Sequence, residues 1–254
     1  MVFTAFIIGT AGSGKSHLTS SFAEKMKEEK QKVAVMNLDP GVATLPYSPE
    51  IDVRDYITIE SVMEEYGLGP NGALLMAADL IAGEIGRLKR EVEEVEPDIL
   101  IVDTPGQMEL FAFRVSGPYI AQAISDESKA IVYLFDSVFS LNPLNYVSNM
   151  LLSAAVYTRF LLPQVHVLSK CDLLPESDLE SVLEWSESSE ALELAINENL
   201  EGTKRLLSQR MTEVIHELDL SFPMIPVSAK TNEGLIELNG ALERVFTGGE
   251  KFTY

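Results

Sequence analysis

The sequence has little cysteine, few histidines and no long apolar run, and each shortage excludes a class of protein. Its one cysteine, Cys171, cannot form an internal disulfide, and no stretch reaches the roughly eighteen apolar residues of a membrane-spanning helix. The three histidines and the cysteine lack the spacing of a zinc site. We therefore expect a cytoplasmic protein without a membrane partner or a zinc ion.

Basic residues are also scarce, because 19 Lys and Arg stand against 39 Asp and Glu, for a formal net charge of −20. A chain this acidic has no general electrostatic affinity for nucleic acid or anionic membranes. We expect no direct nucleic-acid partner, and any phosphate site must be a local positive spot. Apolar residues make up 46% of the 254 residues, which is enough for a sizeable core.

What the sequence does contain is a phosphate-binding motif directly after an apolar stretch. Residues 2–8 are rich in β-branched and aromatic side chains, which predicts a buried parallel strand. Gly9 to Ser16 then fits G-x-x-x-x-G-K-[ST] at every fixed position. In this motif backbone N–H groups approach a polyphosphate, Lys15 offers a cation to the β- and γ-phosphates, and the Ser16 hydroxyl can ligate Mg²⁺.

A helix predicted over 17–29 directs the positive end of its dipole at the same anion. The alternative, a chance glycine-rich turn, is weak because a strand and a helix flank the motif. The predicted nucleotide-binding residues of this stretch are Gly12, Ser13, Gly14, Lys15, Ser16 and His17.

Apolar strands alternate with helical patterns, which is typical of an α/β fold with a mainly parallel sheet. Two helical segments stand apart: one at about 59–95, and an acidic insertion at about 174–218 whose part 173–201 has nine acidic residues and no Lys or Arg. Such a run usually forms a solvated face, and a docking surface for a basic partner is the alternative. We treat 1–254 as one domain with the three-layer P-loop NTPase fold and a helical insertion. Further strands are expected at 32–38, 98–103, 129–136, 164–169 and 221–227.

Local signals set further expectations between these strands. Residues 41–58 are weakly periodic and predict a loop with short turns. Apolar residues spaced 4, 3, 4, 3, 4, 3 predict one long helix over 73–95. Asn232 is the expected cap of a final helix over 233–245, and 247–254 are expected to form a tail.

Two carboxylates each follow a predicted strand, at the edge where a doubly wound sheet binds its ligand. Asp103 and Gly106 form a D-x-x-G pattern, in which the carboxylate reaches Mg²⁺ and the Gly106 N–H senses a γ-phosphate. Gln107 follows at a position where a glutamine can orient the attacking water, although adjacency in sequence leaves its geometry open. Asp39 either belongs to the catalytic site or only opens the turn before Pro40.

Two later motifs indicate the base. Ser169-Lys170-Cys171-Asp172 resembles the [NT]-K-x-D pattern, in which the aspartate accepts hydrogen bonds from guanine N1–H and N2–H₂, donors that adenine lacks in that arrangement. Ser228-Ala229-Lys230 matches the S-A-K pattern, whose backbone N–H meets the guanine O6. Ser169 departs from the first pattern, and its short hydroxyl predicts a looser loop than an asparagine would give. The predicted base-binding residues are Lys170, Asp172, Ser228, Ala229 and Lys230.

With this ordered set of motifs the sequence resembles the GPN-loop GTPases, since Gly69-Pro70-Asn71 lies between the second and third of them. The resemblance covers the whole chain and is strongest to the archaeal member of the family. It implies dimerisation around the nucleotide, with Asn71 reaching the phosphates and the attacking water of the partner subunit. Relatives in the wider class carry a second loop lysine where this chain has Thr10, so an asparagine supplied in trans is a sensible substitute. Without the resemblance, Gly-Pro-Asn would be interpreted as a turn.

The sequence and the resemblance together predict a homodimeric, Mg²⁺-dependent enzyme that hydrolyses GTP to GDP and phosphate as a switch or assembly factor. The related eukaryotic proteins take part in RNA polymerase assembly, which implies that machinery as a protein partner. The alternative is a nucleotide-gated protein-binding scaffold with negligible turnover. A P-loop kinase is less favoured, because 173–201 lacks the basic residues of a kinase lid. The predicted catalytic residues are Asp39, Asn71, Asp103 and Gln107, and the predicted metal ligands are Ser16 and Asp103.

Overall fold

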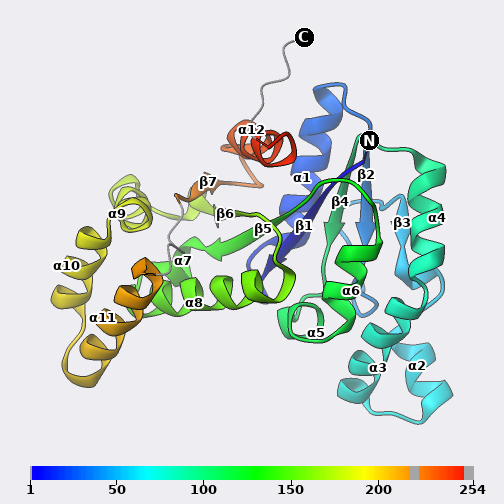
Figure 1. The fold of residues 1–254 in the computed structure, drawn as a ribbon, viewed down its shortest axis with the longest axis horizontal. Coiled ribbons are helices and arrows are strands. Elements are labelled where there is room, and N and C mark those ends of the chain that lie inside the picture. Colours follow the sequence, from blue (N-terminus) through cyan, green and yellow to red (C-terminus); the bar gives the residue numbers. More distant parts are fainter. Residues whose placement is uncertain (1, 218–222, 249–254) are drawn as a thin grey trace.

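The computed structural model describes residues 2–217 and 223–248. Seven strands form one sheet in the order β3-β2-β4-β1-β5-β6-β7, and all of its strand pairs are parallel. Helices cover both faces of the sheet (Figure 1), which confirms the expected three-layer α/β fold. The strands are β1 (Phe3–Gly9), β2 (Val33–Asn37), β3 (Ile51–Asp52), β4 (Ile99–Asp103), β5 (Lys129–Asp136), β6 (Gln164–Ser169) and β7 (Ile225–Val227).

Alternate side chains of each central strand point to opposite faces of the sheet and so build two apolar layers. Ala5 and Ile7 of β1 belong to the layer under α1 (Lys15–Glu28) and α12 (Leu235–Phe246). Phe6 and Ile8 belong to a larger layer on the other face. The helices on that side are α2 (Ile59–Tyr66), α3 (Pro70–Gly83), α4 (Ile85–Val95), α5 (Met108–Ala112), α6 (Ser116–Ala123), α8 (Pro143–Phe160), α9 (Glu176–Glu187), α10 (Ser189–Asn199) and α11 (Gly202–Glu217).

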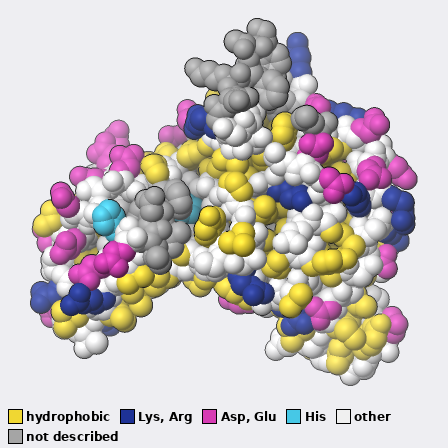
Figure 2. Space-filling view, in the orientation of Figure 1, with side chains coloured by type: hydrophobic (Ala, Val, Ile, Leu, Met, Phe, Trp, Pro, Cys, Tyr) yellow, Lys and Arg dark blue, Asp and Glu magenta, His cyan; other side chains and the backbone are white. Residues whose placement is uncertain are grey.

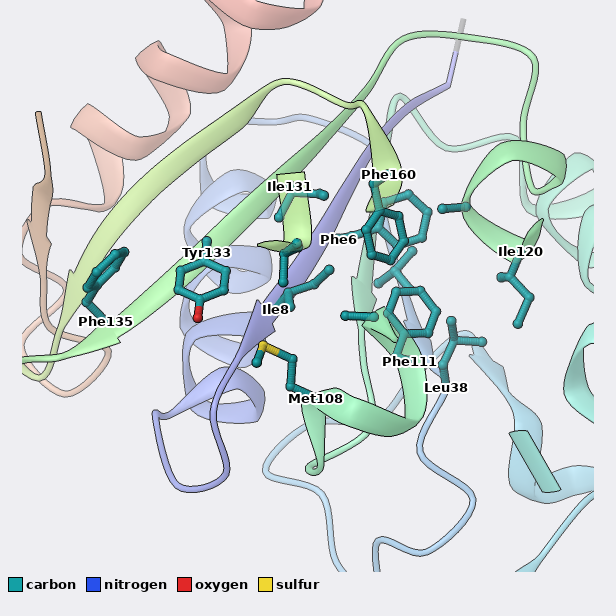
Figure 3. Close-up of a cluster of buried hydrophobic side chains, with 14 of the residues drawn as sticks. Phe6, Ile8, Leu38, Met108, Phe111, Ile120, Ile131, Tyr133, Phe135 and Phe160 are labelled. Atoms are coloured by element: carbon teal, nitrogen blue, oxygen red, sulfur yellow. The ribbon is translucent and has the colours of Figure 1, made fainter. Parts of the chain in front are cut away.

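Aromatic side chains fix the helices of the larger layer against the centre of the sheet (Figure 3). The Phe6 and Phe111 ring centroids are 6.1 Å apart, and those of Phe111 and Phe160 are 5.5 Å apart. Tyr133 is also fully buried there, and its hydroxyl donates to Asn149 Oδ1 at 3.0 Å. Strand β1, which leads into the next loop, is therefore packed on this face by aromatic rings.

Helical lobes lie at opposite edges of the sheet (Figure 1). Helices α2, α3 and α4 lie near the β3 edge, and α9, α10 and α11 lie at the β7 edge. Among the described residues, none of the helices has the length and apolar character needed to cross a bilayer.

Two predictions for the region between β2 and β4 are wrong. The helix predicted over 73–95 is two helices, because Gly83 ends α3 and Glu84 joins it to α4. A glycine in a helix interior is about 1 kcal/mol less favourable than alanine, which weakens the continuous apolar stripe at that point. Helix α3 also starts earlier than predicted, with Pro70 in its first turn, where proline is well tolerated. The loop predicted over 41–58 contains the short β3 and a 3₁₀ turn, which were too short to give a periodic signal.

The end of the chain differs from prediction in one respect. Helix α12 starts at Leu235 and is capped by Gly234, whose φ of 75° interrupts the helix, so Asn232 is not its cap. The last strand is shorter than predicted, and residues 218–222 and 249–254 lie outside the described residues.

Candidate nucleotide-binding site

The phosphate loop joins the carboxyl end of β1 to α1 and turns through two glycines in the left-handed region. Gly12 and Gly14 have φ values of 78° and 93°, which residues with side chains rarely adopt. The Ser13 N–H donates to the Thr10 carbonyl at 3.2 Å, which closes the turn between them. The loop and the first turn of α1 thus present N–H groups and the positive end of a helix dipole together, as phosphate binding requires.

Lys15 is the first residue of α1, and its ammonium lies inside the loop. Its Nζ donates to the carbonyl oxygens of Gly9 at 3.0 Å, Thr10 at 3.1 Å and Gly106 at 3.2 Å. Burial lowers the pKa of Lys15, and nearby carboxylates, led by Asp103, oppose this effect. A cation is therefore fixed between the P-loop and the segment after β4.

Asp103 ends β4 and is almost completely buried beside the P-loop. Its backbone is in register with Ile7 of β1 and Asn37 of β2, so its position in the sheet is fixed on both sides. The Tyr47 hydroxyl donates to Asp103 Oδ2 at 2.7 Å, whereas the buried Oδ1 has no hydrogen-bond partner among the described residues. Burial raises the pKa of Asp103, against the opposing effects of Tyr47 and the neighbouring Ser16 hydroxyl.

The Asp103 carboxylate and the hydroxyl of Ser16 form an oxygen set that fits Mg²⁺. This ion commonly takes one or two protein oxygens and completes its octahedron with phosphate oxygens and water. The described residues contain no cluster of three or more His, Cys, Asp or Glu that could hold a metal by themselves. A metal at this site would therefore share its coordination with a bound nucleotide.

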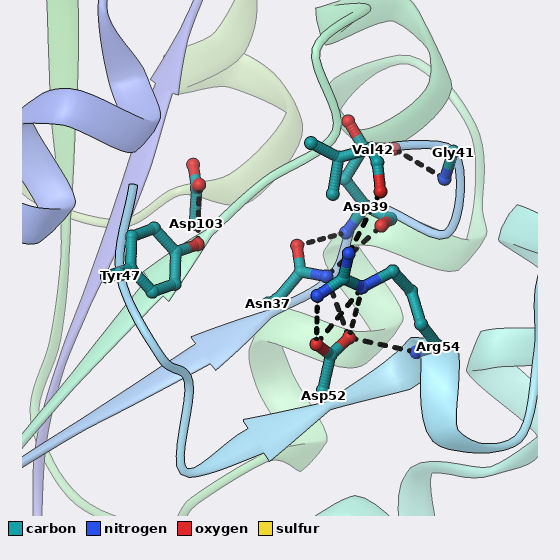
Figure 4. Close-up of polar contacts among 8 residues, drawn as sticks. All are labelled: Asn37, Asp39, Gly41, Val42, Tyr47, Asp52, Arg54 and Asp103. Atoms are coloured by element: carbon teal, nitrogen blue, oxygen red, sulfur yellow. Dashed lines mark hydrogen bonds and ion pairs between the residues drawn. The ribbon is translucent and has the colours of Figure 1, made fainter. Parts of the chain in front are cut away.

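Asp39 follows β2 (Figure 4), and its carboxylate reaches the segment after β4. Its Oδ2 accepts a hydrogen bond from the Gly106 N–H at 2.8 Å, and its Oδ1 accepts one from the Gly41 N–H at 2.9 Å. The structure thus brings together two residues that the sequence assigned to the phosphate end of the site. A phosphate oxygen bound to the Gly106 N–H would take the place of the Asp39 carboxylate.

A polar network at the ends of β2 and β3 fixes Asp39 (Figure 4). Asn37 Oδ1 accepts the Asp39 N–H at 3.0 Å, and its Nδ2 donates to Asp52 Oδ1 at 2.8 Å. Arg54 pairs with Asp52 at 2.6 Å and donates to the Val42 carbonyl at 3.0 Å. Burial by itself would raise the pKa of Asp52, but the hydrogen bonds from Arg54 and Asn37 hold this pKa below its usual range.

A cavity of about 490 Å³ opens beside the P-loop, where the sequence places the base. Its size suits a nucleoside, and most of its lining residues come from the three predicted motifs. The lining residues are Gly14, His17, Leu18, Ser169, Lys170, Asp172, Leu173, Val227, Ala229 and Lys230.

The Asp172 carboxylate is oriented by the loop after β7. Ser228 donates its hydroxyl hydrogen to Asp172 Oδ1 at 2.7 Å and accepts the Lys230 N–H at 3.2 Å. The Ala229 carbonyl accepts a hydrogen bond from the Ser21 hydroxyl of α1 at 2.9 Å. The two base loops and α1 therefore form one connected unit.

Ser169 bridges to the P-loop more closely than expected. Its hydroxyl lies 2.8 Å from the Ser13 carbonyl and 3.0 Å from the Phe135 carbonyl. The expectation of a looser loop is therefore wrong, because the end of β6 lies close enough to the P-loop for a hydroxyl to span the distance. Lys170 adds a second bridge, since its Nζ donates to the Gly12 carbonyl and to Asp136, both at 2.6 Å.

Two predicted catalytic residues are not brought into this hydrogen-bonded site. Gln107 is exposed at the start of α5, and Asn71 is exposed in the first turn of α3. Neither side chain makes a hydrogen bond within the part of the chain that the structure describes. Leu74 of the same helix comes within 3.4 Å of the position a Cβ would take at Gly41, so α3 begins beside the loop that follows Asp39.

Sequence reasoning missed Tyr47 and Asp136 at this site. Asp136 ends β5, so the rule that singled out Asp39 and Asp103, a carboxylate at the end of a parallel strand, would also have found it. Tyr47 belongs to no motif, and only the folded chain brings it to Asp103.

Comparisons with known proteins identify the family of this chain. A family model described as a conserved hypothetical ATP binding protein matches residues 7–248. The GPN-loop GTPase of Pyrococcus abyssi is 33% identical over 248 residues, which cover 96% of this chain and 97% of that protein. A solved structure of a GTPase in apo form from Pyrococcus abyssi matches with a TM-score of 0.85 at 30% identity, over 96% of this chain and 97% of that chain.

Eukaryotic relatives are similar but longer. GPN-loop GTPase 1 of Saccharomyces cerevisiae is 31% identical over 253 residues, or 95% of this chain, and the GPN-loop GTPase QQT2 of Arabidopsis thaliana is 31% identical over 240 residues, or 93% of this chain. The chain spans 65% and 62% of these two proteins, just under two thirds of their length. Because its similarity to the Pyrococcus abyssi protein extends over almost all of both, the chain belongs to the GPN-loop GTPase family.

Proposed function

We propose that this protein binds GTP and, with Mg²⁺, hydrolyses it to GDP and phosphate. The observation that carries the proposal is the Asp172 carboxylate, which Ser228 holds at 2.7 Å on the wall of a cavity beside the P-loop. In such a cavity Asp172 would accept hydrogen bonds from both guanine donors. The Lys170 side chain would cover the base, and the Ala229 N–H would donate to the guanine O6. Adenine would leave the carboxylate without these hydrogen bonds, which is costly. GTP is therefore favoured over the ATP in the description of the matching family model.

The phosphate end of the site would hold the rest of the nucleotide. Lys15 and the N–H groups of the P-loop bind the β- and γ-phosphates, and His17 lines the path between phosphate and base. Ser16 and Asp103 hold Mg²⁺, which would neutralise charge that develops on the phosphates. Because Lys15 and Asp103 are buried, their charges would act on the phosphates with little screening by solvent.

Three residues would position the attacking water. Asp39 lies within 2.8 Å of the Gly106 N–H, so a γ-phosphate that binds this N–H would release the carboxylate close to the reacting phosphorus. Gln107 directly follows Gly106, and its side chain is exposed. Asn71 is equally exposed, and we assign it to the active site of a second subunit.

A homodimer would bury an apolar face that the single chain leaves exposed. Val115, before α6, is 82% exposed, and Leu161, after α8, is 75% exposed. Arg159 donates to the Arg114 carbonyl at 3.5 Å, which places these two segments next to each other. Hydrophobic side chains also gather across the middle of the face shown in Figure 2, and patches of this kind commonly mark protein interfaces.

A nucleotide-gated scaffold is the second candidate function, and the contact between Asp39 and Gly106 favours it. A γ-phosphate would break this contact and free the loop after β2, so nucleotide state would change the surface of the protein. A cytoplasmic factor for RNA polymerase assembly would use such a switch. Binding of a partner from that machinery should then differ between the GTP and GDP forms. Equal binding by the two forms would contradict the scaffold function and would leave GTP hydrolysis as the proposed function.

The proposed function is tested by nucleotide binding and phosphate release. Calorimetric titration with GTP and ATP should show at least roughly 100-fold tighter binding of GTP, given the guanine contacts of Asp172. Phosphate release should require both GTP and Mg²⁺ and should stop in EDTA. Equal affinity for ATP would contradict the assignment of the base, and turnover that is indifferent to Mg²⁺ would contradict the assignment of Ser16 and Asp103.

A further inference from the structure

The loop between β2 and β3 sends one side chain, Tyr47, to the metal end of the site (Figure 4). Its hydroxyl donates to Asp103 Oδ2 at 2.7 Å, although 56 residues separate the two in sequence. Tyr47 therefore contacts the Asp103 carboxylate from outside the predicted motifs.

Two further contacts hold Tyr47 in place. Its ring packs against the apolar layer under α1 and α12, and the side chain is partly buried. The hydroxyl of Ser20, on α1, donates to the carbonyl of the preceding residue, Pro46, at 3.2 Å. The tyrosine hydroxyl therefore reaches Asp103 from a segment that is anchored to the helix of the phosphate loop.

This contact decides which oxygen of Asp103 is available. The strand pairing of β4 fixes the backbone of Asp103, so the orientation of the carboxylate depends on its side-chain torsions. Tyr47 engages Oδ2, and the buried Oδ1 is the atom that has no hydrogen-bond partner among the described residues. Hydrogen bonds to a ligating carboxylate are a common means of orienting it toward a metal.

We propose that Tyr47 is a positioning residue of the metal site, whose hydroxyl fixes Asp103 so that Oδ1 faces a divalent cation bound together with the guanine nucleotide. The inference rests on the proposed function, because Asp103 is a metal ligand only if the nucleotide binds with its cation. Tyr47 does not touch the nucleotide in this account, so its removal acts on the metal and leaves the base and phosphate contacts in place.

The test is the affinity of the GDP complex for Mn²⁺, which replaces Mg²⁺ and is detected by electron paramagnetic resonance. Tyr47→Phe keeps the ring and its packing but removes the hydroxyl. We expect its Mn²⁺ affinity to fall about tenfold or more, as is typical when a hydrogen-bond partner of a metal ligand is lost. GDP affinity in EDTA should stay within about twofold of the unaltered protein, because no metal-independent contact is removed.

A matched control is Tyr56→Phe, which also removes a buried tyrosine hydroxyl. Unlike that of Tyr47, this hydroxyl has no hydrogen-bond partner among the described residues. This ring lies 4.1 Å below the Arg87 guanidinium, in the α2–α4 region. The control should leave Mn²⁺ affinity unchanged.

Three outcomes of this test would overturn either the positioning role of Tyr47 or the proposed function. Unchanged or tighter Mn²⁺ binding by Tyr47→Phe would overturn the positioning role. An equal loss of GDP affinity in EDTA would also overturn it, since a merely structural tyrosine would have that effect. Failure of the unaltered protein to bind Mn²⁺ with GDP would instead contradict the proposed function.

Discussion

Single residues of the site differ in how far the sequence could predict them. Lys15 and Asp172 belong to motifs that follow strands, where motif spacing sets the geometry; the structure places Lys15 inside the P-loop, at the start of α1, and Asp172 on the wall of the cavity. Tyr47 and Asp136 escaped because their partners lie 56 and 34 residues away, and no local pattern encodes such a contact. The reach of the Ser169 hydroxyl was misjudged, because the distance between β6 and the P-loop is a tertiary property.

Asp172→Asn should change the base that the protein prefers. An asparagine amide can accept one hydrogen bond and donate another, which suits xanthine better than guanine. With guanine, the amide keeps one hydrogen bond to a neutral oxygen and sets its N–H₂ against the guanine N2–H₂, which corresponds to about 10²- to 10⁴-fold weaker GTP binding. Calorimetry with GTP and XTP should show the preference reversed.

The control for this substitution is Glu176→Gln, which neutralises an exposed carboxylate at the start of the nearby α9. It should leave the preference for GTP intact. A comparable loss in the control would assign the effect to net charge rather than to recognition of the base.

At the scale of elements, strands were predicted better than helix boundaries. The predicted bounds of β5 and β6 agree with the structure, because a strand buried on both faces reads as a continuous apolar run. The boundary between α3 and α4 was missed because the apolar stripe continues from Ile81 to Ile85, while the backbone of Glu84 between them departs from helical geometry, with φ −88° and ψ 8°. The two-residue β3 has too few residues for any periodic signal.

Ser169→Ala should loosen the junction between β6 and the P-loop. The substitution removes the hydrogen bond to the Ser13 carbonyl, and one such bond contributes about 1 kcal/mol. We expect GDP affinity to fall roughly fivefold, while Ser177→Ala on exposed α9 changes nothing. Equal affinities of both variants in a fluorescent GDP titration would show that the bridge does not support the nucleotide site.

His166 in β6 should make stability depend on pH. Its Nε2 lies 2.8 Å from Ser153 Oγ, and burial lowers the pKa of His166 to about 4. The unfolded chain, with an ordinary pKa near 6.5, takes up a proton before the folded chain does, so stability falls as the pH drops from about 6.5 to about 4. The effect is about 3 kcal/mol once the pH is below both values.

This dependence is measured by urea unfolding at pH 7.5, 5.5 and 4.5. His166→Gln should show a shallower fall in the free energy of unfolding with decreasing pH, whatever its stability at pH 7.5. His216→Gln, at an exposed position of α11, should retain the full slope. Identical slopes in all three proteins would contradict the assignment.

At the scale of the whole molecule, the alternation of strands and helices was sufficient to predict a parallel three-layer fold, since parallel strands require crossover connections. The idea that a second subunit completes the site came from the family resemblance. The arrangement of the chain is compatible with it: Asn71 is exposed at the start of α3, and an apolar face lies around Val115 and Leu161. The charge of −20 adds repulsion between two copies, so the apolar face must outweigh it.

GTP turnover in mixtures of Asn71→Ala and Lys15→Ala proteins tests the central claim most directly. Each variant alone should hydrolyse GTP slowly, because one lacks the trans asparagine and the other the phosphate-binding cation. In a mixed dimer, the subunit with intact Lys15 receives Asn71 from its partner, so one site of two is complete. An equal mixture at fixed total protein should therefore recover up to about a quarter of the unaltered turnover, given random pairing. No recovery at any ratio, with both variants shown to pair, would contradict an active site shared between two subunits.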